Sequence, residues 1–234
     1  MEMKESFNWT STTTGNSPFG SFIVGGNNNT ISTGYSQSFI GGGGCNTING
    51  AASVIVGGTG NSTAGTVSIV GGGTGNSASA TYSGVFSGNT NQVLTQSSVI
   101  AGGACNAITG CAETSFIGGG YGNCLKQTGT VIGGGFGNQV AGIYSSVLGG
   151  MSNSASGAYS SILGGSGNSD GGFNYAGVFG QGITAVAPNT FHVECLNAIN
   201  TPIYTGLGYL PGTIFGLCNL YPPPVGAYPL YFQS

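Results

Sequence analysis

A nine-residue pattern that recurs ten times at a nearly fixed period constrains this chain more than any other feature. Counted back from a recurrent anchor Asn, the pattern has Ser or Thr at position −8, Ile or Val at −6, and Gly at −4 and −3, with Ser87 the single exception at −4. A period this short predicts a solenoid, because one turn can bury a core only by stacking on its neighbours. Seven of the nine intervals between anchors are equal and two are slightly longer; the anchors are Asn29, Asn46, Asn61, Asn76, Asn91, Asn106, Asn123, Asn138, Asn153 and Asn168.

Each repeat reads as one coil of two strands and two bends. Two glycines in every turn argue against a helix, since each would cost about 1 kcal/mol relative to Ala. The Ser-x-Ile/Val segment predicts a strand of about five residues, and Gly-Gly predicts the bend after it. A second strand follows the anchor, with position +2 often apolar. We therefore expect an all-β fold, a single-chain parallel β-roll or solenoid of about ten coils with position −6 in its core.

The first strand of each coil is apolar on both sides. Positions −7 and −5 point away from the core at −6, yet every coil has at least one large apolar residue there, whereas positions +1 and +3 of the second strand are mostly polar. A strand that is apolar on both faces is buried on both. We predict that copies of the chain associate along this face, about a rotation axis parallel to the rod. The predicted oligomer-interface residues are Phe22, Phe39, Val54, Ile69, Phe86, Val99, Phe116, Val131, Leu148 and Leu163.

The pattern Ser-x-Ile-x-Gly-Gly-x-x-Asn, recurring at this short period from about position 20 to about position 185, resembles a known family. It looks like the head of trimeric autotransporter adhesins (the YadA type), and similar repeats are found in phage and large-virus fibre proteins. The resemblance implies a left-handed parallel β-roll, three copies of which pack around a threefold axis as a homotrimer. The sequence departs from those adhesins in lacking a secretory signal, a coiled-coil stalk and a membrane anchor, which favours a virion fibre.

The repeats divide the chain into three parts. We expect a flexible lead-in or attachment segment at 1–17, the β-roll repeat domain at 18–187 and a small β tail or cap at 188–234. Residues 178–182 read as a last, imperfect coil, and 230–234 partly match a protease-tag remnant. The two longer intervals add small loops near 30–37 and 107–114, which carry Tyr35, Cys111 and Glu113. Such loops are either tolerated insertions or binding loops on a rigid scaffold.

Composition excludes several partners. Only 3% of residues are charged, there is no Arg, and Lys4 and Lys126 are the only Lys residues. Binding to nucleic acid needs clustered basic residues, so we expect none. No apolar run is long enough to cross a membrane, so we expect no membrane insertion. The six cysteines form no Cys-x-x-Cys pair, which indicates free thiols or, alternatively, disulfides between chains or coils.

The sequence offers no catalytic set and no metal or cofactor site. His192 is the only histidine, so one chain has no material for a multi-His metal site, and only this residue could serve a Ser-His-Asp triad. His192 and Glu194 lie on one face of a predicted strand; we interpret them as ordinary polar residues, a cluster of three His192 about a threefold axis being the alternative. The Ser ladder at −8 has no accompanying base. The Asn ladder predicts stacked amides rather than a calcium site, because calcium prefers carboxylates.

We therefore expect a structural protein and not an enzyme: the rigid trimeric rod of a fibre or spike on the surface of a virus or phage particle, made without a signal peptide. Its termini would bind capsid or tail proteins, and its loops or tip a host receptor or glycan. The alternative is the head domain of a bacterial trimeric surface adhesin. An ice- or glycan-binding solenoid would need a regular polar ladder, which the mixed +1 and +3 positions do not provide. The period, and the lack of His in the coils, disfavour a hexapeptide-repeat acyltransferase.

Overall fold

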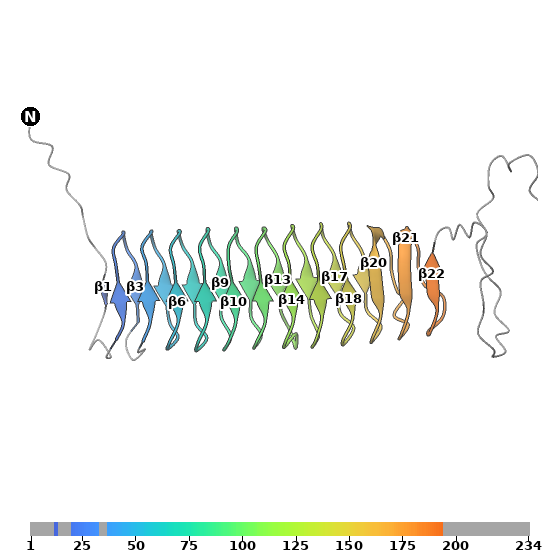
Figure 1. Cartoon of the computed structure of the whole chain (residues 1–234), viewed down its shortest axis with the longest axis horizontal. Helices are drawn as coiled ribbons and strands as arrows, with labels where there is room; N and C mark the ends of the chain where they lie inside the picture. The colour runs from blue at the N-terminus through green and yellow to red at the C-terminus, as the bar shows by residue number, and fades with distance from the viewer. Residues whose placement is uncertain (1–11, 14–19, 33–36, 194–234) are drawn as a thin grey trace, which may run out of the picture.

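Two parallel β-sheets run the length of an elongated rod (Figure 1). The computed structural model describes residues 12–13, 20–32 and 37–193, and no helix occurs among them. The ten-stranded sheet consists of β1 (Thr12–Thr13), β3 (Thr30–Ile31), β5 (Thr47–Ile48), β7 (Ser62–Thr63), β9 (Ser77–Ala78), β11 (Gln92–Val93), β13 (Ala107–Ile108), β15 (Cys124–Leu125), β17 (Gln139–Val140) and β19 (Ser154–Ala155). The twelve-stranded sheet consists of β2 (Phe22–Ile23), β4 (Phe39–Ile40), β6 (Val54–Ile55), β8 (Ile69–Val70), β10 (Gly84–Val85), β12 (Val99–Ile100), β14 (Phe116–Ile117), β16 (Val131–Ile132), β18 (Ser146–Val147), β20 (Ser161–Ser166), β21 (Gly177–Gln181) and β22 (Phe191–Val193).

Each coil up to β19 contributes one strand to each sheet, the last coils contribute only to the twelve-stranded sheet, and strands pair in parallel with the same strand of the next coil. Val85 of β10, for example, is opposite Ile100 of β12, one repeat further along the chain. This arrangement confirms the predicted all-β parallel solenoid, in which one sequence repeat forms one coil. Residues 178–181 lie in β21, the strand of the expected last coil, and β22 adds one further strand beyond it.

The strands are shorter than predicted. Most contain two residues, not about five, although β20 has six and β21 five. Left-handed backbone at Tyr82 (φ 57°) and Gly88 (φ 107°) bounds the segment around β10, and only Gly84 and Val85 within it pair as a strand. A separate row of single parallel bridges, such as Thr59 with Thr74, runs at position −2. Each coil therefore has three short regions of coil-to-coil backbone pairing, where the sequence predicted two.

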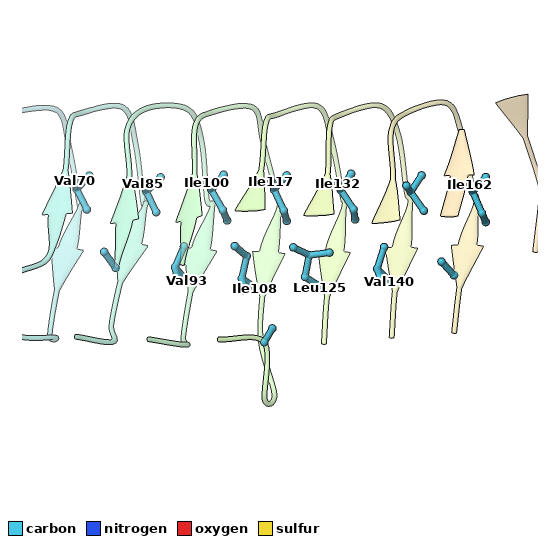
Figure 2. Packing of buried hydrophobic residues seen from close by; sticks show 14 of the residues in the cluster. Val70, Val85, Val93, Ile100, Ile108, Ile117, Leu125, Ile132, Val140 and Ile162 are labelled. Carbon is cyan, nitrogen blue, oxygen red and sulfur yellow. The ribbon is translucent and has the colours of Figure 1, made fainter. Parts of the chain in front are cut away.

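The core is a narrow double row of side chains between the sheets. Figure 2 shows side chains at position −6, such as Ile100 and Ile117, lying opposite side chains at position +2, such as Ile108 and Leu125. All four are fully buried. The prediction that the ladder at −6 forms the core is confirmed. Because each coil supplies only one or two apolar core side chains, its stability depends on stacking against its neighbours.

A ladder of buried asparagine amides connects the coils. The Oδ1 atom of Asn61 accepts the backbone N–H of Asn76 at 2.9 Å, and the Nδ2 of Asn61 donates to the carbonyls of Gly57 at 2.9 Å and Gly73 at 3.0 Å. All ten anchors are buried and repeat this arrangement. The predicted amide stack is therefore confirmed.

The serine ladder at −8 makes hydrogen bonds to the backbone of the other bend, which leads into the twelve-stranded sheet. Ser53 is buried; its Oγ donates to the Gly65 carbonyl at 2.9 Å and accepts the backbone N–H of Ser68 at 3.2 Å. Small hydroxyl side chains fit here because they satisfy backbone groups inside a narrow coil.

The two glycines of the bend have different roles. At −3, Gly73 has φ 88°, and a Cβ there would overlap the Gly88 carbonyl oxygen of the next coil. At −4, a Cβ on Gly72 would have no heavy atom within 4 Å. The glycine at −3 is thus required by both conformation and space, while position −4 has room for a side chain at Gly72, and one coil has Ser87 there.

Both ends of the chain are described only in part. The lead-in predicted for 1–17 lies outside the described residues except for Thr12 and Thr13, which pair with β3. Of the tail predicted for 188–234, residues 188–193 are described, and Phe191–Val193 join the twelve-stranded sheet as β22. Residues 230–234 lie outside the described part.

Candidate functional site: the contact face

The outer side of the twelve-stranded sheet carries the ten residues that the sequence assigns to an oligomer interface. We call the outward positions −7 and −5 of this sheet, from Phe22 to Leu163, the contact face. Seven of the ten side chains are exposed, Phe22 at 61% and Leu148 at 55% among them. Val54, Ile69 and Val99 are half-buried. The structure thus places all ten on one side of one sheet, pointing away from the core.

Large and small residues compensate for each other within most coils of the contact face. Coils with Gly at −5 have a large residue at −7. A Cβ at Gly41 would overlap the Val56 carbonyl oxygen of the next coil and lie 3.4 Å from Phe39 Cε1, so the neighbouring backbone leaves no room for a side chain there and the Phe39 ring lies close by. The coil of Gly84 has the reverse order, with Phe86 at −5. One large apolar side chain per coil therefore covers the sheet, and side chains such as Phe39 lie close to their small neighbours.

Charge is absent from the contact face. Among the described residues only Glu113, Lys126 and Asp170 carry a formal charge, and none of them lies on it. The outer side of the ten-stranded sheet differs, since its +1 positions begin Thr30, Thr47, Ser62, Ser77 and Gln92. One side of the rod is therefore polar and the other apolar. A continuous apolar patch of this kind marks an interaction surface.

The residues that were candidates for catalysis or metal binding do not form a reactive cluster in the described part of the chain. His192 lies opposite Val178, at the core position −6 of the final strand, and its Nε2 is 2.6 Å from the Thr190 Oγ1. Its predicted neighbour Glu194 lies outside the described residues. Cys45, Cys105, Cys111 and Cys124 are free thiols in the described part of the chain, and Cys195 and Cys218 lie outside it. No group of three potential metal ligands occurs within the described ranges.

The loop near 107–114 is fastened to the rod. Cys111 and Glu113 are exposed, whereas Ala112 between them is buried and its carbonyl accepts hydrogen bonds from Thr95 Oγ1 and Ser98 Oγ, both at 2.9 Å. Thr128 Oγ1 donates to the Cys111 carbonyl at 2.7 Å. The inserted residues therefore form a small anchored bulge. Tyr35, in the other predicted loop, lies outside the described residues.

One residue that the sequence reasoning missed is Asp170, a buried carboxylate at the core position +2 of the last regular coil. Its Oδ1 accepts the backbone N–H groups of Ser156 and Gly172, each at 3.0 Å, and its Oδ2 accepts that of Gly157 at 2.7 Å. The ten-stranded sheet ends one coil earlier, at β19. Asp170 thus satisfies the backbone donors left where the second sheet ends, and its placement at a +2 position was the available signal.

The aromatic stacks on the bends were also missed. Tyr144, Tyr159 and Tyr175 stack at centroid distances of 5.5 and 5.0 Å, and Tyr121 stacks on Phe136 at 5.4 Å. Each ring follows its neighbour by one coil in the sequence, and this regular recurrence was the signal that could have found them.

Comparison with known proteins adds no relative. No protein-family model matches the chain, and no curated protein matches it. No membrane-spanning helix is found in the part of the chain that the structure describes. The structure itself defines the class of protein: a rod-like parallel β-solenoid with one apolar side.

Proposed function

We propose that the chain is the structural rod of a homotrimeric fibre or spike carried on the surface of a virus or phage particle, and that it has no enzymatic activity. The observation that carries the proposal is the contact face, which has a large apolar side chain at each of ten successive strands, β2 to β20, although the opposite side of these strands already forms the core. A strand apolar on both faces is buried on both. The number three and the location on a particle rest on the resemblance of the repeats to adhesin heads and viral fibres.

The periodicity of the contact face supports a second copy of the chain as the partner. Each coil presents its apolar residue at the spacing of the parallel strands, about 4.8 Å. A partner that covers every coil must have the same axial repeat, and a parallel copy of the chain has it. The absence of charge fits the same partner, because like charges would otherwise lie opposite each other in a symmetric assembly.

Self-association is tested by the mass of the full chain in solution, by sedimentation at micromolar concentration. Phe86→Asp places a charge on the contact face, and Leu94→Asp places one in the same coil on the outside of the ten-stranded sheet. The wild-type side chains are 51% and 45% exposed in the single chain, so neither is needed for the coil to fold. We expect trimers for the wild type and Leu94→Asp, and monomers for Phe86→Asp, because an unpaired charge in an apolar interface is costly. A monomeric wild type would refute the proposal.

The location on a particle is tested separately. Antibodies against the rod should label the surface of purified particles in electron micrographs, and capsid or tail genes should lie beside the gene for this chain. A neighbouring or continuous gene region that encodes a secretion signal and a membrane anchor would instead support the head of a bacterial surface adhesin. Binding of capsid or tail proteins at the termini, and of a host receptor or glycan at the loops or tip, would follow from the particle assignment.

A further inference from the structure

Two stacks of apolar side chains lie on the bends that border the contact face, and only in the second half of the described rod. The first, Tyr144–Tyr159–Tyr175, occupies position −9, before the strands of the twelve-stranded sheet. The second, Tyr121–Phe136 followed by Met151, occupies position −2, after the bend that ends those strands. We call these the bend ladders. All six side chains are at least 50% exposed.

The fold does not need aromatic residues at these positions. Earlier coils have Thr59 and Thr74 at −2, and Ala52 and Ser97 at −9, with the same backbone path. Position −9 is left-handed, with φ 53° at Tyr144 and φ 68° at Gly129. Such a backbone is unfavourable for any side chain and favours glycine. Every described coil has this left-handed residue at −9, Ala52 and Val67 among them, so the conformation does not depend on tyrosine. The tyrosines are large and at least half exposed where smaller residues keep the same backbone, which points to a role outside the single chain.

The geometry of the ladders favours a protein partner with the same repeat. Neighbouring rings cover each other face to face, with interplanar angles of 5° for Tyr159 and Tyr175 and 11° for Tyr121 and Phe136. A sugar ring that stacks on an aromatic face finds those faces occupied. The ring edges and the hydroxyl groups stay accessible to a partner, one set in each coil. They lie beside the contact face, which also has an apolar side chain in each coil.

The area of the contact face is small for a stable interface, and the bend ladders enlarge it. The ten strands of the contact face, at about 4.8 Å each and with two outward columns about 10 Å wide together, cover roughly 500 Å² per copy. This is below the roughly 800 Å² per partner of a standard specific interface. Positions −9 and −2 lie outside both columns, so an apolar border on each side widens the surface in the coils where it occurs.

We propose that the bend ladders extend the contact between copies of this chain over residues 121–175, so that this half of the rod holds the assembly together. The inference rests on the proposed self-association. It assigns the ladders to the borders of the interface, where each packs against the bend of an adjacent copy.

The test uses the full chain and substitutions that are native to other coils. A four-site variant, Tyr121→Thr, Phe136→Thr, Tyr144→Ser and Tyr159→Ser, gives these coils the residues of earlier ones; Tyr82→Ser, at an isolated −9 position in the first half, is the matched control. The concentration at which oligomers dissociate is measured by sedimentation over a dilution series, and circular dichroism verifies the fold. We expect the four-site variant to dissociate at a concentration roughly tenfold or more above that of the wild type. For the control, the dissociation concentration should rise by less than about threefold.

The outcomes separate the two proposals. A wild-type chain that is monomeric at every concentration overturns self-association itself. A wild-type oligomer whose dissociation is unchanged in the folded four-site variant overturns only the role of the bend ladders, as does an equally large effect of Tyr82→Ser. A weakened oligomer with an unchanged fold and a weak control effect supports the inference.

Discussion

Replacement of one anchor asparagine should destabilise the rod far more than replacement of an exposed asparagine nearby. Asn76→Ala removes an Oδ1 atom that accepts the N–H of Asn91 at 3.0 Å, and an Nδ2 that donates to the carbonyls of Gly72 and Gly88, both at 2.8 Å. The Asn91 N–H, in a fully buried residue, is left without its partner, while the Gly88 carbonyl keeps the backbone N–H of Thr74. An unsatisfied buried donor costs about 1–3 kcal/mol. With the lost hydrogen bonds and the void, we expect a loss of roughly 3 kcal/mol.

The assay is guanidinium unfolding followed by circular dichroism, with all variants at one protein concentration because association adds to apparent stability. Asn89→Ala is the matched control: Asn89 is exposed at position −2, where Gly44 and Ala104 stand in other coils. It should change the free energy of unfolding by less than about 0.5 kcal/mol. If the two variants differ by less than about 1 kcal/mol, the amide ladder does not hold the coils together as described.

Four further substitutions test particular positions. Thr63→Val should raise the unfolding free energy by about 1 kcal/mol, because the Thr63 Oγ1 is buried without a hydrogen-bond partner in the described structure; a lower denaturation midpoint would contradict this. Gly73→Ala should cost at least about 2 kcal/mol through its left-handed backbone and the overlap with the next coil, while Gly72→Ala should cost less than about 1 kcal/mol; equal midpoints would refute the distinction. Asp170→Ala should speed amide hydrogen exchange at residues 156–157 and leave the exchange rates of the first coils unchanged. Wild-type exchange rates at residues 156–157 in this variant would show that the hydrogen bonds of Asp170 are dispensable.

The regular part of the fold could be predicted because every coil repeats the same physical requirement. Position −6 is buried, position −3 needs left-handed backbone, and the anchor must bond backbone groups of two coils, so each restricts the residue type in all ten repeats. Asn61 and Gly58 are informative because their counterparts in nine other coils are identical. A single coil would not have revealed these roles.

The other features of the fold could not be predicted, because no residue type marks them at the same position in every repeat. The left-handed residues that bound each strand segment include, at −9, Val67 and Tyr82, whose residue types do not predict such a conformation. Asp170 is the only carboxylate at a +2 position, in the coil where the second sheet ends. The bend ladders occupy a few coils at positions that vary elsewhere. Of the contact face, the sequence predicted which side chains point outward, while their mutual covering required coordinates.

The mass of the wild-type chain in solution decides most directly whether the rod associates with copies of itself. One chain has a mass of 23.0 kDa, and the apolar contact face predicts a species three times as heavy that persists on dilution to the micromolar range. A mass of one chain across the whole dilution series would mean that the contact face stays exposed to water, and it would contradict the central claim that the rod is built to associate with copies of itself.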